Sequence, residues 1–530
     1  MGQFARCFGM IWVGMVFVDA VALVLSRVYC LARRTLYAVR CTLYDSMKQS
    51  LLYLLLCSSV SAQSDPPHKL ASRAETSSLL LDDTRELCDT VGGRPTGSAA
   101  CDRAVDWAAK KFRDAGLQKV NVEQFSIPRL WLPGTAEATA TAPEKWTLRI
   151  AAAPMSPSSK GALEARLVDV GDGTPEDFSK LAGSLKGAIA LVRSKEMKTF
   201  DDLFAEYLKN PGLIESAKKY GIAALLLEST RPRGLLYRHP ISLTMDLAPV
   251  PTAIVSREHA ERLARLAQNG EVRVRLSIAN EIGGPYQSRN VVAEIRGREK
   301  PDEIVLLGAH LDSWDMGTGA EDNGINAAMV IDTARAFQQL DVKPRRTVRF
   351  VLFTGEEQGM LGSEAYVAHH KAELDNHVAV VVFDIGSGHT SGFYLNGRDD
   401  LRKPLNTTLD AVGGLDATEH VPDAIDGTDN LDFALSGVPN LVAVQDPAPY
   451  LPDYHAESDT FDRVNAKEAK RNEAIAAVVL WGLADSPERW AKRQSRAEVE
   501  KMVTDTKLDE QMKLFGQWDD FKAGRRGFAK

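Results

Sequence analysis

Five short segments of the sequence each hold an acid or a histidine directly after an apolar stretch or in a loop. They are GAHLDSWD (308–315), GTGAEDNG (317–324), FTGEEQG (353–359), FDIGSG (383–388) and PDYHAESDT (452–460). A single acid or histidine is usually solvated or caps a helix, but together these segments supply two histidines and three acids, with one acid to spare. Imidazole and carboxylate groups are suitable zinc ligands. The joint pattern therefore predicts a metal site, with zinc as a suitable ion.

The spare acid comes from the adjacent pair Glu356 and Glu357. Two neighbouring carboxylates beside an apolar strand repel each other and lose hydration, so they need a compensating cation. Hydrolysis also needs a group that takes a proton from water and passes it to the leaving amine. Because adjacent residues at a strand end can point in different directions, one glutamate can bind metal while the other faces the water. The spacing alone leaves open which is which.

The elements that position these residues alternate between strands and helices from residue 290 onward. The expected strands are 290–295, 303–309, 347–353, 378–383 and 440–444, and a helix is expected at 325–340. Several of these strands are apolar almost throughout, as strands buried on both faces are. The pattern predicts an α/β fold with a mostly parallel central sheet flanked by helices. Ligands collect at the carboxyl ends of the strands of such a sheet.

Residues 131–285 have a different sequence pattern, with short apolar runs among Gly/Pro turns and no cluster of acids and histidines. They are expected to form a smaller inserted α/β domain that carries no catalytic residue, neither His239 nor His259. The main domain then consists of residues 63–130 and 286–530. In its first part, Ser98 is expected to cap a helix that precedes a strand at 120–127.

The first 62 residues are predicted to be a targeting region. Lys48 follows Met47, residues 51–57 are apolar, and Val60-Ser61-Ala62 places small residues at −3 and −1 of a cleavage site. We therefore expect an export signal at 47–62, cleavage between Ala62 and Gln63, a secreted or periplasmic protein, and no stable membrane span in the mature chain. The alternative is an N-terminal anchor at residues 11–25.

After such a cleavage only two cysteines remain, Cys88 and Cys101. An exported chain with two cysteines close in sequence is expected to join them in a disulfide. The alternative is two separate buried thiols.

The motifs GAHLDSWD, EDNG, TGEEQG, FDIG and YHAESDT together resemble the M28 family of co-catalytic zinc peptidases. The order H…D…EE…D…H matches that family over about residues 290–465. HLDSWD and TGEEQG are most similar to its branch of secreted aminopeptidases and dipeptidases that includes carboxypeptidase Q. The insert resembles a protease-associated domain, which some members carry at this place. The resemblance implies a zinc-exopeptidase-like fold and two Zn²⁺ per chain.

The resemblance also implies the ligands of each zinc ion. His310 and Asp384 would hold one ion, Glu357 and His455 would hold the other, and Asp322 would bridge both.

The resemblance assigns three further roles near the metals. Glu356 would be the general base on a metal-bound water and then the general acid. Asp312 would orient the ring of His310 as a supporting carboxylate. Tyr454 occupies a position where some members have a tyrosine that steadies the tetrahedral intermediate, and the alternative for it is a packing residue.

The predicted function is therefore exopeptidase hydrolysis of short peptides, as an aminopeptidase or a dipeptidase. A formal charge of −7 over 530 residues argues against a nucleic-acid binder, which needs a basic face. The alternatives are a non-catalytic receptor-like protein, which no missing ligand supports, and a single-zinc glutaminyl cyclase on the same fold. Residues 428–430 line the specificity pocket or form a simple turn; the substrate-binding residues are otherwise unknown, and a homodimer is an open alternative.

Overall fold

The computed structural model describes residues 65–242, 244–413 and 415–528. The expected export signal at 47–62 and the apolar stretch at 11–25 lie outside these residues. Within the described ranges, no helix has both the length and the apolarity needed to cross a membrane.

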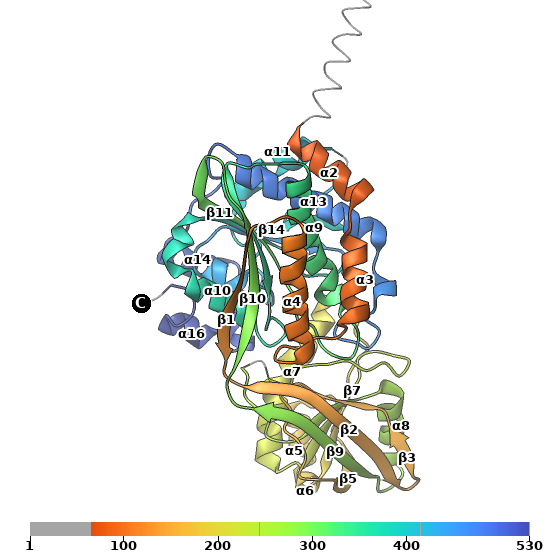
Figure 1. Cartoon of the computed structure of the whole chain (residues 1–530). Coiled ribbons are helices and arrows are strands. Elements are labelled where there is room, and N and C mark those ends of the chain that lie inside the picture. The colour runs from red at the N-terminus through yellow and green to blue at the C-terminus, as the bar shows by residue number, and fades with distance from the viewer. Residues whose placement is uncertain (1–64, 243, 414, 529–530) are drawn as a thin grey trace, which may run out of the picture. The chain divides into compact units, whose positions relative to one another are not determined.

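The sheet that carries the predicted ligands has seven strands (Figure 1). In spatial order they are β1 (Lys119–Ile127), β10 (Tyr286–Ile295), β12 (Arg346–Phe353), β11 (Lys300–His310), β13 (His377–Val382), β15 (Asn440–Gln445) and β14 (Thr390–Tyr394). The five strands expected from residue 290 onward are all present. The four strands β12, β11, β13 and β15 are parallel, whereas β1, β10 and β14 pair antiparallel. The sheet is therefore mixed, and the prediction of a mostly parallel sheet is wrong at both edges, because an apolar run indicates burial and not direction.

Helices cover both faces of this sheet, and the strand residues alternate between two apolar clusters. Val305, Phe350 and Val381 face the larger cluster, while Leu306, Val351 and Val382 face the smaller one. The larger cluster contains residues of α2 (Pro66–Ser77), α3 (Leu80–Thr90), α4 (Ala99–Asp114), α9 (Ile325–Gln339) and α13 (Ala466–Asp485). The smaller cluster contains residues of α10 (Leu361–His369) and α12 (Leu431–Leu435). Two-sided burial explains why the central strands are nearly all apolar.

Two predicted elements near the start of the described chain are confirmed. The Ser98 hydroxyl accepts a hydrogen bond from the Cys101 amide and so caps α4, as expected. The strand expected at 120–127 is β1. Beyond α13, the short helices α14 (Arg496–Asp505), α15 (Leu508–Leu514) and α16 (Trp518–Ala523) pack with α12 in a further apolar cluster. The remaining helix, α11 (Arg402–Asp410), packs on α13.

A second sheet of eight strands is built entirely from residues 130–283. In spatial order its strands are β3 (Trp146–Leu148), β2 (Leu130–Ala142), β9 (Arg273–Gly283), β5 (Leu163–Asp169), β6 (Ile189–Val192), β7 (Ala224–Glu228), β8 (Thr252–Val255) and β4 (Ile150–Ala152). Figure 1 shows β2 and β9 running side by side as they continue from β1 and β10. The helices of this region are α5 (Pro175–Lys180), α6 (Ala182–Leu185), α7 (Phe200–Tyr220) and α8 (Arg257–Ala267). The segment expected to be an α/β insert thus has its own sheet, while its status as a separate domain stays a prediction.

The predicted disulfide is wrong in this structure, because Cys88 and Cys101 are both free and buried. Burial raises the pKa of both thiols. Both thiols are buried without a bond between them, so closeness in sequence did not predict their pairing.

Candidate dinuclear metal centre

The predicted ligands converge at the carboxyl ends of neighbouring parallel strands. His310 is the last residue of β11, Asp384 follows β13 by one residue, and Glu356 and Glu357 lie in the turn after β12. Asp322 lies in an irregular turn, Ala320–Gly324, directly before α9. His455 reaches the same place from the loop after β15. The sheet therefore brings together residues that are far apart in the sequence.

The first candidate metal group consists of His310, Asp322 and Asp384, all buried. The Nε2 atom of His310 lies 2.9 Å from Oδ1 of Asp384 and 3.3 Å from Oδ1 of Asp322.

The second candidate group consists of Asp322, Glu357 and His455, also buried. The Nε2 atom of His455 lies 2.8 Å from Oε2 of Glu357 and 3.4 Å from Oδ2 of Asp322. Asp322 thus presents one carboxylate oxygen to each group.

The hydrogen bonds of the two histidines show what this arrangement needs. Nδ1 of His310 donates to the Asp312 carbonyl at 3.0 Å, and Nδ1 of His455 donates to the Arg238 carbonyl at 3.0 Å. Both Nε2 atoms therefore direct lone pairs at carboxylate oxygens when the rings are neutral. Oδ2 of Asp322, Oε1 of Glu357 and Oδ1 of Asp384 are buried and have no hydrogen-bond partner among the described residues. Acceptors facing acceptors in a buried site require a cation, so these residues fit metal ions.

The pKa values of the two histidines reflect the same charge arrangement. Burial lowers the pKa of His455 to about 4, which keeps its imidazole neutral, as a metal ligand must be. Burial also acts on His310, but the nearby carboxylates of Asp384 and Glu356 outweigh it and raise the pKa of this histidine. Either a proton on His310 or a bound metal ion would supply the positive charge that these buried carboxylates require.

The support of His310 differs in detail from the prediction. Its ring is held by the backbone carbonyl of Asp312, and the nearest carboxylate oxygen of Asp312 lies 3.7 Å away. The other carboxylate oxygen accepts a hydrogen bond of 2.6 Å from the Thr96 hydroxyl. Asp312 is fully buried and fixes the ring through its main-chain carbonyl.

Glu356 belongs to neither metal group. Its Oε2 atom lies 3.9 Å from Nε2 of His310, and its side chain lines the cavity in front of the two groups. Burial raises the pKa of Glu356 well above its ordinary value, and the charges of Asp384 and Glu357 raise it further, against the effect of His310. A carboxyl group with a raised pKa beside a metal site is suited to proton transfer.

The cavity in front of the ligands has a volume of about 350 Å³ and mostly apolar walls. Glu356, Glu357, Asp384 and His455 form its metal-side wall. Its apolar lining includes Phe200, Leu203, Phe204, Ile385, Tyr394, Ile425, Val442, Tyr450 and Phe515. A cavity of this size accommodates a small ligand.

Two predicted site segments line this cavity only in part. The ring of Tyr454 stacks on His455 with centroids 3.6 Å apart, and its hydroxyl lies 3.1 Å from that of Tyr207. In the 428–430 loop, Thr428 lines the cavity, whereas Asp429 and Asn430 are fully buried and are not part of the lining.

Two groups of residues around the site were missed at the sequence level. The first is Asp459, whose carboxylate accepts hydrogen bonds from the amides of Ala320, Glu321 and Asp322 at 3.0, 2.7 and 3.1 Å. It holds the turn that carries Asp322, and its place in the YHAESDT motif was the available signal. The second is the face of α7 with Phe200, Leu203, Phe204 and Tyr207. Nothing in the sequence of 131–285 indicated that this helix reaches the cavity.

Comparison with known proteins identifies the family. The family model described as "Peptidase family M28" matches residues 290–480. Carboxypeptidase Q of Mus musculus is 30% identical over 406 residues, which cover 76% of this chain and 85% of that protein. The chain belongs to peptidase family M28. The M28 resemblance read from the motifs is therefore confirmed, and the protein is a metallopeptidase.

Two solved structures are similar to this chain. A peptidase M28 precursor from Shewanella amazonensis SB2B has a TM-score of 0.73 and 31% identity, covering 81% of this chain and 98% of that one. BSAP, a zinc aminopeptidase from Bacillus subtilis, has a TM-score of 0.61 at 20% identity and covers 79% of this chain and 97% of that one, a likeness that shows the fold.

Proposed function

We propose that this M28 peptidase is a two-zinc exopeptidase that hydrolyses short peptides, as an aminopeptidase or a dipeptidase. The observation that carries the proposal is the position of Asp322, whose two oxygens lie 3.3 Å and 3.4 Å from the Nε2 atoms of His310 and His455. His310, Asp322 and Asp384 would hold one zinc ion, and Asp322, Glu357 and His455 would hold the other. All five ligand positions are filled, which argues against a receptor-like protein.

When bound, two zinc ions polarise the scissile carbonyl and make water a nucleophile near neutral pH. Glu356 takes the proton of the attacking water and then delivers it to the leaving amine. Its carboxyl group is free for this task because Glu357, and not Glu356, contacts a histidine Nε2 at 2.8 Å. Asp312 fixes the ring of His310, and Asp459 fixes the turn of Asp322.

The form of the cavity supports a short substrate. Residues of α7 line one side, and Phe515, directly after α15, contributes to the wall. A dipeptide fits into about 350 Å³. The apolar lining favours peptides with apolar side chains.

The test combines metal analysis with peptide assays. The wild-type protein is expected to hold two zinc ions in this centre, and Asp322→Ala is expected to lose both, since each group needs this residue. Free dipeptides, N-acetylated dipeptides and longer peptides should then be compared as substrates. Loss of only one ion in Asp322→Ala would refute the bridging role, and absence of hydrolysis by the fully metallated protein would refute the function.

We also propose export, with cleavage between Ala62 and Gln63, and that residues 131–285 form a protease-associated domain. The positive charge of Lys48, the apolar residues 51–57 and the small residues at 60–62 support the proposed export. N-terminal sequencing of the protein recovered outside the cytoplasm tests it, and a mature chain that retains residues 1–46 would overturn it.

A further inference from the structure

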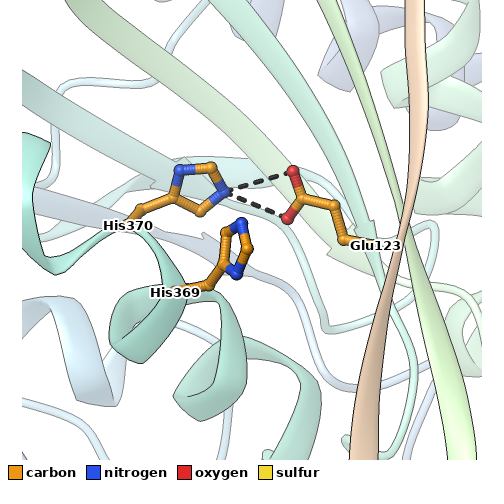
Figure 2. Close-up of side chains that lie close together, drawn as sticks. All are labelled: Glu123, His369 and His370. Atoms are coloured by element: carbon orange, nitrogen blue, oxygen red, sulfur yellow. Dashed lines mark hydrogen bonds and ion pairs between the residues drawn. The ribbon is translucent and has the colours of Figure 1, made fainter.

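A second cluster of metal-ligating side chains lies apart from the catalytic ligands, between the edge strand β1 and the end of α10. Glu123 comes from β1, His369 is the last residue of α10, and His370 follows it. One ligand atom from each lies within 4.8 Å of the others. Figure 2 shows the two rings and the carboxylate facing one another, with one nitrogen of His370 directed at both oxygens of Glu123.

The hydrogen bonds of His370 prepare one of its nitrogens for a metal ion. Nδ1 is hydrogen-bonded to the carboxylate of Glu373 and lies 3.4 Å from Nη1 of Arg349, while Nε2 lies 3.0 Å and 3.2 Å from the two oxygens of Glu123. A carboxylate that accepts from Nδ1–H fixes the tautomer and leaves the Nε2 lone pair for a metal. The ring is also held by Tyr366, whose centroid is 4.2 Å away.

The charges around the cluster leave Glu123 without a permanent cation. Arg349 pairs with Glu373 at 2.8 Å and with Glu294 at 2.7 Å, and Lys119 also pairs with Glu294. In the described part of the chain, the ion-pair partner of Glu123 is His370, and no lysine or arginine pairs with it. When both histidines are neutral, the negative charge of Glu123 is not compensated, so the cluster can accept one cation.

We propose that Glu123, His369 and His370 form a third metal site that binds a divalent transition-metal ion, with zinc as the expected ion. Two imidazoles and one carboxylate suit zinc better than calcium or magnesium, which prefer oxygen ligands. His369 is exposed, and the side chains of His370 and Glu123 are 12% and 18% exposed, so the ion can enter from solvent and keep water as a further ligand. This openness makes the site weaker than the buried catalytic centre.

The ion would link β1 and α10, two elements that are connected to the parts of the chain around the active site. β1 is the strand that leads into β2 of the second sheet, and α10 begins directly after the turn that carries Glu356 and Glu357. Zinc at this site therefore stabilises the folded protein without contacting the catalytic residues, because a ligand that binds only the native state raises its stability.

The experiment uses the whole protein, with Zn²⁺ alone as the probe. Wild type, Glu123→Gln and His369→Ala are equilibrated at a series of buffered free zinc concentrations, and bound zinc and the unfolding temperature are measured. Glu137→Gln and His389→Ala serve as controls, since Glu137 is an exposed strand residue and His389 is a partly exposed histidine outside the cluster. Comparing variants with wild type makes the result independent of how many ions the catalytic centre holds.

Wild type and both controls should bind one more zinc ion than the two cluster variants, and should gain more in unfolding temperature as zinc rises. Glu373→Gln should keep the site but weaken its affinity by about 10- to 100-fold, as expected for a residue that orients a ligand. All variants should hydrolyse peptides like wild type at zinc levels that fill only the catalytic centre. Equal zinc binding by wild type and His369→Ala would overturn the proposal and leave His370 as a simple ion-pair partner of Glu123 and Glu373.

Discussion

The hydroxyl of Tyr207 lies 3.1 Å from the hydroxyl of Tyr454, so a helix of the inserted segment contacts the residue that precedes a metal-ligand candidate. Two further contacts join the same parts of the chain. Arg231 donates to the Tyr454 carbonyl at 3.1 Å, and the Arg238 amide donates to the His455 carbonyl at 3.0 Å. The insert was expected to carry no catalytic residue, and these contacts give it a positioning role for the loop of His455.

Tyr207→Phe tests this positioning role. Loss of one hydrogen bond is worth about 1 kcal/mol, which corresponds to a fall of about fivefold in kcat if the Tyr454 hydroxyl acts on the reacting peptide. Metal content should not change, because no ligand is removed. Tyr220→Phe is the matched control, since Tyr220 ends the same helix and stacks on Phe178 away from the cavity. If the two variants have the same kcat, the hydroxyl pair has no part in catalysis.

A buried acid in the cavity wall predicts a pH dependence of stability. Burial raises the pKa of Asp426 to about 7, and its Oδ2 atom has no hydrogen-bond partner among the described residues. Its ordinary value is 3.8. Between these two pH values the folded state holds a proton that the unfolded state has released, so this group lowers stability as pH rises toward 7.

Asp426→Asn should remove this loss of folding stability at higher pH. The variant and wild type should be equally stable near pH 4, and the variant should be more stable at pH 8, by about 4 kcal/mol at most from the pKa difference. Unfolding temperatures measured across this pH range check the prediction. Asp423→Asn is the control, because Asp423 is exposed on the same loop. A stability difference that does not vary with pH would assign the effect of Asp426→Asn to packing.

The sequence predicted which acids and histidines converge, for a physical reason. Ligands at the carboxyl ends of parallel strands follow apolar runs, and both signals are local in the sequence. His310, Asp384 and the Glu356–Glu357 pair were found in this way, and family resemblance divided the ligands between two ions. The structure brings the five proposed ligands together in two groups that share Asp322.

The missed features depend on contacts between distant segments. The direction of β10 and β14 depends on how the chain enters the sheet and not on their apolar patterns. Tyr207 and Tyr454 are 247 positions apart in the sequence. The residues around one of them do not indicate that it contacts the other. The hydrogen bond from His310 to the main-chain carbonyl of Asp312 was not predicted. Every residue has such a carbonyl group, so the residue type does not indicate which one accepts a hydrogen bond.

The two cysteines provide a direct test of the corrected prediction. The protein unfolded without reductant should show two reactive thiols in a chain that starts at Gln63, because Cys88 and Cys101 are free. The folded protein should react slowly, since both residues are buried and their thiol pKa values are raised. Thiol titration with and without denaturant, followed by peptide mass spectrometry, gives the answer. A Cys88–Cys101 peptide pair in the non-reduced digest would restore the disulfide.

Glu356 and Glu357 are neighbours with different contacts, and the proposed function gives them different tasks. Oε2 of Glu357 lies 2.8 Å from Nε2 of His455, whereas Glu356 belongs to neither metal group. Glu357→Ala should therefore lose or weaken one zinc ion. Glu356→Gln should keep both ions, because glutamine has nearly the same shape and the position is not a ligand.

Glu356→Gln should nevertheless lose most activity, because the amide cannot carry the proton from water to the leaving amine. General acid–base catalysis contributes about 10²–10⁴-fold, and kcat should fall by this factor while KM changes little, because substrate binding does not need the proton. Zinc analysis and steady-state kinetics on both variants separate the two roles. Metal loss in Glu356→Gln with retention in Glu357→Ala would exchange the assignments. An unchanged kcat in Glu356→Gln would remove the base from the mechanism, because Glu357, Asp322 and Asp384 are already engaged as the proposed ligands.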